Sequence, residues 1–221
     1  MTWVFIWWLS WGIFFLYIFK KADYIKNFLF TSAYFLATAL ITISVFAGHI
    51  GRAIEGFVWP PIIALVVFLG VQICVFYFVP KYVREPRGYL ENHPTRQFLH
   101  PNFRRLFSKS FDILAQQVFV LLLVMFLQDA SLALGQIILF FAIIFGAVHV
   151  PLIMIDRGAW QSWFFSIFSV ISAFVFPVLI AKIHYGFVYS YIVHWSFYLI
   201  TTTVFWVWQE RQSVKIIKAN I

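Results

Sequence analysis

The chain has little of what a water-soluble protein needs on its surface. Only 11% of its 221 residues are charged and 63% are hydrophobic, so too few polar side chains exist to cover a soluble core of that size. A single cysteine, Cys74, rules out an intrachain disulfide. Acidic residues are also scarce, with 8 Asp and Glu against 16 Lys and Arg. These shortages exclude a water-soluble globular domain and a disulfide-stabilised secreted one.

Seven apolar stretches take up most of the chain. A helix needs about 20 consecutive apolar residues to cross the roughly 30 Å hydrocarbon core of a bilayer, and seven windows approach that length. They cover residues 2–19, 28–48, 57–80, 111–128, 132–155, 160–181 and 187–208. The sequence therefore predicts an all-α fold, a polytopic transmembrane helical bundle with seven spans in one domain over residues 1–221.

The basic residues predict how the bundle is oriented. All of them except Arg52 and Lys182 lie after the first, third, fifth or last predicted span. Basic loops stay on the cytoplasmic side of a membrane, so we expect the amino terminus outside and the carboxyl terminus in the cytoplasm. The chain then divides into a three-helix front part (1–80), a cytoplasmic basic loop (81–110), a four-helix back part (111–209) and a short cytoplasmic tail (210–221).

The same basic residues also predict the partners of the chain. They flank spans instead of forming one stripe, which favours contact with anionic lipid headgroups and excludes nucleic acid as a partner. We therefore expect membrane lipids as partners, together with a membrane peptide or protein. Nothing in the sequence predicts the oligomeric state.

Polar side chains inside the predicted spans mark the candidate site, because such groups cost free energy in lipid unless they have partners. They lie in the back part of the chain. The set comprises Gln116 and Gln117 on the fourth span, Phe145 and His149 on one face of the fifth, and Tyr191, His194 and Tyr198 on one face of the seventh. We expect these residues to line a polar pocket that opens from the cytoplasmic side.

Helix geometry predicts which of these residues meet. At 1.5 Å of rise per residue, Gln116 and His149 both lie roughly 8–10 Å from the cytoplasmic boundary. Counted from the outer end of its span, His194 lies roughly 10 Å further along the membrane normal. The sequence therefore predicts contact between Gln116 and His149, with His194 at the far wall.

Three short motifs in this region resemble those of the CPBP family, the CAAX-processing and bacteriocin-processing intramembrane endopeptidases. Phe145-Gly146-Ala147-Val148-His149 matches the family's FxxxH motif, and His194 with Tyr198 takes the place of its last motif, which has Asn or Asp four residues after the histidine. The paired-glutamate motif EExxxR reads Gln116-Gln117-Val118-Phe119-Val120-Leu121 here. The resemblance covers about residues 110 to 205.

What the resemblance implies is a changed activity. In the family a glutamate activates water and the histidines assist, so His149 and His194 occupy catalytic positions here. A glutamine amide cannot accept a proton as a general base, although it still donates and accepts hydrogen bonds. We therefore expect a CAAX protease-like pseudoenzyme with a polar pocket lined by Gln116, Gln117, Phe145, Tyr191 and Tyr198. The resemblance also implies a bacterial plasma membrane as its location.

Two other functions remain open. A helical scaffold or subunit of a membrane complex would use the same polar groups only to satisfy one another. A b-type haem protein would use His149 and His194 as axial ligands. We expect no cofactor and no metal, since the pair of histidines has no third or fourth zinc ligand beside it in the predicted spans, but zinc and haem both stay alternatives.

Overall fold

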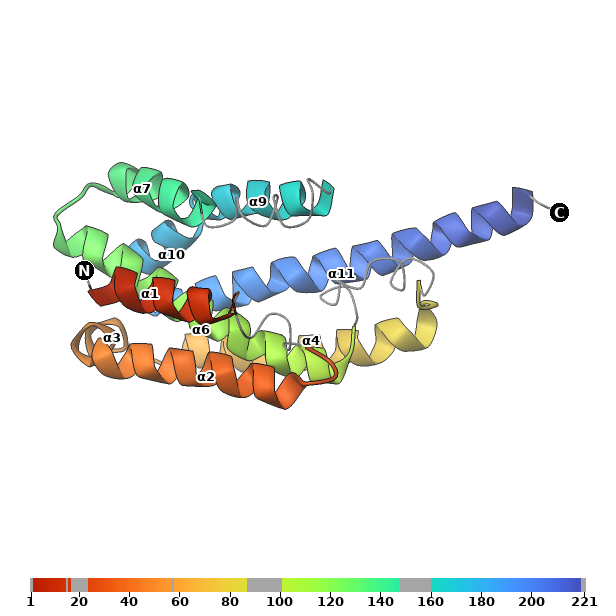
Figure 1. Ribbon diagram of the computed structural model, residues 1–221, viewed down its shortest axis with the longest axis horizontal. Helices are drawn as coiled ribbons and strands as arrows, with labels where there is room; N and C mark the ends of the chain where they lie inside the picture. Colours follow the sequence, from red (N-terminus) through yellow and green to blue (C-terminus); the bar gives the residue numbers. More distant parts are fainter. Residues whose placement is uncertain are drawn as a thin grey trace.

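The computed structural model describes residues 2–14, 16, 24–56, 58–86, 101–147 and 160–219, with side chains described from 163 to 208 in the last segment. This part of the chain is helical with connecting turns and has no strand, which confirms the all-α prediction there (Figure 1). The helices are α1 (Thr2–Ile13), α2 (Phe28–Val45), α3 (Ala47–Ala53), α4 (Trp59–Tyr82), α6 (Phe103–Asp129), α7 (Leu134–Ala147), α9 (Trp160–Ser172), α10 (Phe176–Lys182) and α11 (Gly186–Ala219).

The lengths and compositions of these helices indicate an integral, multi-pass membrane protein. Four segments of the described residues are long and apolar enough to cross a bilayer: Phe28–Val45, Trp59–Tyr82, Phe103–Asp129 and Trp163–Lys182. The helices α1 and α7 have only 12 and 14 residues, and α11 is longer but interrupts its apolar residues with tyrosine, histidine, serine and threonine. Seven spans and the orientation of the termini stay predictions.

Proline positions fix the starts of two helices. Pro60 and Pro61 lie in the first turn of α4, and Pro177 lies in the first turn of α10. Backbone N–H groups in the first turn have no partner within the helix, so a proline there costs no helical hydrogen bond. The predicted sixth span is accordingly broken at residues 173–175 into α9 and α10.

The helix α6 lies at the centre of the bundle. It contacts α1, α2, α3, α4, α7, α10 and α11, and its residues 118–124 are all buried. By contrast, α4 exposes large apolar side chains such as Val66 (62%) and Val67 (61%). A buried central helix surrounded by helices with apolar outer faces is the arrangement expected when lipid is the solvent.

The start of α6 corrects the predicted cytoplasmic loop. The helix begins at Phe103, where the side chain of Asn102 accepts a hydrogen bond from the backbone N–H of Arg104 (2.8 Å) as an N-cap. Residues 103–110, predicted as loop, are therefore helical. Arg105 and Lys109, predicted to lie at the cytoplasmic surface, are buried, with exposed fractions of 0% and 7%.

Candidate functional site

Gln117 and His194 form the centre of the candidate site. The Nε2 amide of Gln117 donates to Nδ1 of His194 (2.8 Å), and Oγ of Ser190 donates to Oε1 of Gln117 (2.7 Å). All three side chains are buried. Because the amide nitrogen can only donate, Nδ1 of His194 accepts, and the neutral ring carries its proton on Nε2. Two of the predicted site residues therefore meet.

This contact corrects the predicted depth of His194. The sequence placed His194 roughly 10 Å from the paired glutamines along the membrane normal, whereas it lies in direct hydrogen-bond contact with Gln117. The expected partner of Gln116, His149, lies outside the described residues, so the predicted contact between those two stays a prediction.

The other predicted pocket residues pack instead of lining open space. Tyr198 stacks on His194 (ring centroids 5.6 Å apart), and Tyr191 donates to the backbone oxygen of Ser110 (3.4 Å). Phe145, on α7, packs against Phe141 and Phe176, and Phe176 also contacts the ring of His194 (5.5 Å). Two cavities of the described residues illustrate this: neither is lined by His194, and Gln116 lines the smaller one.

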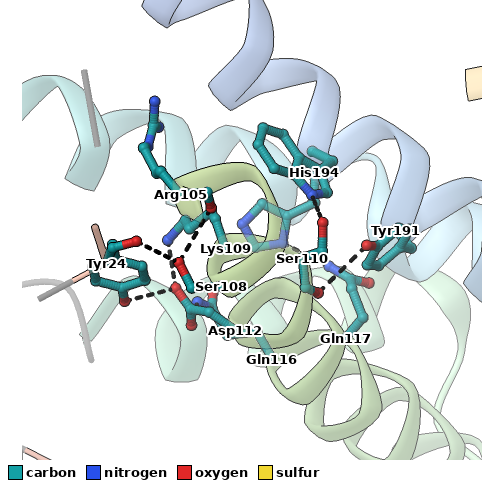
Figure 2. Close-up of polar contacts among 11 residues, drawn as sticks. Tyr24, Arg105, Ser108, Lys109, Ser110, Asp112, Gln116, Gln117, Tyr191 and His194 are labelled. Atoms are coloured by element: carbon teal, nitrogen blue, oxygen red, sulfur yellow. Dashed lines mark hydrogen bonds and ion pairs between the residues drawn. The ribbon is translucent and has the colours of Figure 1, made fainter. Parts of the chain in front are cut away.

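Gln116 points to a different group of residues. Its Nε2 donates to Oδ1 of Asp112 (2.7 Å), one helical turn earlier in α6. Asp112 also accepts from Nζ of Lys109 (2.6 Å) and from the hydroxyl of Tyr24 (3.0 Å), so its carboxylate lies among three protein donors (Figure 2). The paired glutamines therefore serve two separate networks.

The Asp112 network ties the segment before α2 to α6. Tyr24 lies in the turn at residues 24–27, and burial together with the adjacent Asp112 carboxylate raises its pKa well above the ordinary value. The hydroxyl therefore stays protonated and donates at physiological pH. Ser108 strengthens the same junction because its Oγ donates to the backbone oxygen of Tyr24 (3.0 Å).

Two buried cations lie on the same face of α6 as this carboxylate. Nζ of Lys109 lies 4.2 Å from the ring centroid of Tyr198, which gives it a cation–π contact besides its ion pair with Asp112. Arg105, fully buried one turn earlier, donates from Nη1 to the hydroxyl of Thr202 on α11 (3.2 Å). Charges of this kind are costly to bury and persist only when their surroundings hold them.

Sequence reasoning missed Arg105 and Lys109 because it counted them as loop charges, and it missed Asp112 although this residue lies inside the predicted fourth span. A signal was present: positions 105, 109, 112 and 116 recur at steps of 4, 3 and 4, which places them on one helical face. That face continues directly into the predicted fourth span. An amphipathic extension of the helix would have accounted for them better than a loop.

The described side chains of this site make hydrogen bonds to one another. A water-activating base must be free to accept a proton, and Gln117 cannot, while the oxygens of Asp112 already accept from three side chains. In the part of the chain that the structure describes, no three His, Cys, Asp or Glu side chains gather as a metal site would need. Because His149 is outside that part, haem ligation by His149 and His194 remains open, and the expectation of no cofactor stays a prediction.

No family model, curated protein or solved structure matches this chain. The resemblance to the CPBP endopeptidases therefore rests on its three motifs. Function has to be argued from the geometry of the site.

Proposed function

We propose that the protein is a non-proteolytic, multi-pass membrane protein with a CPBP-like arrangement of motifs, whose buried polar residues join helices instead of processing a substrate. The observation that carries this proposal is the carboxamide of Gln117, whose nitrogen and oxygen both have protein partners, His194 and Ser190. A site built to bind and activate water would leave such groups available to it.

The proposal unites the pseudoenzyme and scaffold readings of the sequence. Gln117, Ser190 and His194 join α6 to α11, and Trp195 of α11 adds a hydrogen bond from Nε1 to Oγ of Ser110 on α6 (3.1 Å). Hydrogen bonds between buried polar side chains hold helices in a fixed arrangement in lipid. We infer that a fixed α6–α11 pair provides a rigid platform for a membrane peptide or protein partner in a bacterial plasma membrane.

A peptide-cleavage assay tests the absence of proteolysis. Purified protein in detergent is incubated with a prenylated peptide substrate, beside a Gln117→Ala variant and a His194→Ala variant. We expect no cleavage above buffer from any of the three. Cleavage by the wild type that both substitutions abolish, in variants that remain folded, would disprove the proposal.

Absorption spectroscopy tests the haem alternative separately. A bis-histidine haem protein purified without added cofactor is coloured and shows a Soret band. We expect the purified protein to be colourless in the visible range. A Soret band that disappears in His194→Ala would replace the scaffold proposal with the haem function.

Co-purification tests the scaffold function itself. After mild solubilisation, a scaffold keeps a fixed partner, and Gln117→Leu should release it because the α6–α11 contacts are broken. Val66→Ala, on the exposed face of α4, is the matched control and should keep the partner. If both Gln117→Leu and Val66→Ala keep the partner, or if both lose it, the platform is not built on α6 and α11.

A further inference from the structure

A second concave region lies at the end of the bundle where α3, α6 and α10 end and α11 begins. It is a cavity of about 210 Å³, partly open to the outside. Its exposed side carries Arg52, Gln128 and His184, and its more buried side is lined by Leu121, Met125 and Ile180. A concave site with an apolar interior and a few polar groups at its opening is the usual form of a small-molecule site.

The walls of this cavity are held in a strained conformation. Tyr185 has a φ of 55°, which non-glycine residues rarely adopt, and its hydroxyl donates to the backbone oxygen of Ile54 (2.7 Å). Next to it, Nε2 of His184 lies 3.0 Å from the backbone oxygen of Gly56, whose φ is 70°. Strained backbone of this kind persists where the surrounding structure fixes it, and it concentrates at functional sites.

The position of Arg52 is also fixed. Its Nη1 and Nη2 donate to the two carboxylate oxygens of Asp129 (3.1 and 2.7 Å), and half of its side chain is exposed. A guanidinium has five N–H donors, so the pair with Asp129 orients the group and leaves donors for a ligand. Arginine held in this way is well suited to phosphate oxygens.

The geometry points to a phospholipid as the occupant, with its phosphate at Arg52 and a segment of one acyl chain along Leu121, Met125 and Ile180. From Leu121 to Gln128 the wall of α6 rises about 10 Å, which matches a headgroup at the membrane boundary and a chain running toward the membrane interior. The cavity is too small for a whole lipid, so the remaining chain lies along the outer faces of the helices.

The headgroup must provide the selectivity of this site. An acyl chain is surrounded by apolar groups in the bilayer as well as in the cavity, so moving it from one to the other changes little. Arg52 can donate a charge-assisted hydrogen bond to a phosphate oxygen, and an uncharged lipid has no such oxygen to accept it. Diacylglycerol, which has the same chains and no phosphate, is therefore the appropriate comparison.

Thermal unfolding of delipidated protein in detergent tests the site. We expect dioleoyl phosphatidylglycerol to raise the unfolding temperature saturably, and dioleoylglycerol or inorganic phosphate to give no saturable rise. Met125→Trp, which fills the cavity, should abolish the rise. Arg52→Gln should raise the half-saturating lipid concentration at least about tenfold. Lys182→Gln, an exposed cation in the last turn of α10, is the matched control and should behave as the wild type.

Each other outcome overturns a defined part of the inference. An equal rise in unfolding temperature with dioleoylglycerol would show that the phosphate does not contribute to binding. An equal rise with inorganic phosphate would show that the acyl chain does not contribute. An unchanged lipid response of folded Met125→Trp would place the lipid elsewhere. None of these measurements depends on proteolysis or on a protein partner, so the lipid site and the proposed function can fail independently.

Discussion

At the scale of single residues, Asp112 supports more of the buried polar network than any predicted site residue. We expect Asp112→Asn to destabilise the protein by about 3–5 kcal/mol, because it leaves the buried ammonium group of Lys109 without its carboxylate partner. Asp129→Asn breaks an exposed pair with Arg52 and should cost less than about 1 kcal/mol. Thermal or denaturant unfolding in detergent measures both. Equal losses would show that Asp112 is not held as the structure describes.

Gln117 and Ser190 allow a test of whether the hydrogen-bonded group acts as a unit. We expect Gln117→Leu alone to cost about 1–3 kcal/mol, because it leaves buried polar partners unsatisfied. In the double variant with Ser190→Ala one of those partners is gone, so the two losses should not add, with a coupling of about 0.5–3 kcal/mol. Unfolding free energies of the four proteins give this coupling. Simple additivity would contradict the contact.

Residue identity was easier to predict than residue depth. Gln117 and His194 were selected because polar groups inside apolar spans need partners; the structure gives both of them partners, but their contact with each other was not expected. The depth calculation assumed helices that start and end at the same level. Gln117 lies about 18 Å from the end of α6 at Asp129, whereas His194 lies only about 12 Å from the start of α11 at Gly186, so the two helices are offset along the bundle.

At the scale of helices, Gly186 permits the close approach of α10 and α11. A Cβ there would lie 1.8 Å from the backbone oxygen of Leu179, so Gly186→Ala must push the two helices apart. We expect a loss of about 1–3 kcal/mol. Gly70→Ala on α4 is the control, since nothing lies within 4 Å of a Cβ there, and it should stabilise by up to about 1 kcal/mol through helix propensity.

The unfolding temperatures of Gly186→Ala and Gly70→Ala test whether α10 and α11 approach each other this closely. If Gly186→Ala is as stable as the wild type, then the α10–α11 junction is looser than described. Hydrogen exchange gives a second measurement, because a separated junction should lose protection in the first turn of α11 before the rest of the helix does.

Helix boundaries could be predicted only where their cause is local. The break before Pro177 follows from the chemistry of proline alone. The start of α6 at Phe103 has a local cap in Asn102, but the burial of its first turns depends on partners far away in the sequence: Tyr24 for Asp112, and Thr202 for Arg105. Within a short window of sequence, Arg105 and Lys109 are only two charges without partners, which favours a loop. In the folded chain they lie on a buried helical face.

At the scale of the whole molecule, the alternation of basic residues still predicts one orientation. With Arg105 and Lys109 buried, the stretch from the last turn of α4 to the first turn of α6 keeps five basic residues, Lys81, Arg84, Arg87, Arg96 and Arg104, so the positive-inside argument stands. The start of α1 and the end of α11 lie at opposite ends of the described structure (Figure 1), which favours an odd number of crossings between them.

Cysteine accessibility tests both the orientation and the number of crossings. In a Cys74→Ser background, single cysteines are placed at three exposed positions, Gly48, Tyr82 and Ala133, and intact cells are treated with a membrane-impermeant maleimide. If the amino terminus is outside and α2, α4 and α6 each cross once, Gly48→Cys and Ala133→Cys react in intact cells, whereas Tyr82→Cys reacts only after permeabilisation. If only Tyr82→Cys reacts in intact cells, the orientation of the chain in the membrane is the opposite of the predicted one. Equal reaction of Tyr82→Cys and Ala133→Cys would mean that α6 does not cross, despite its length and burial.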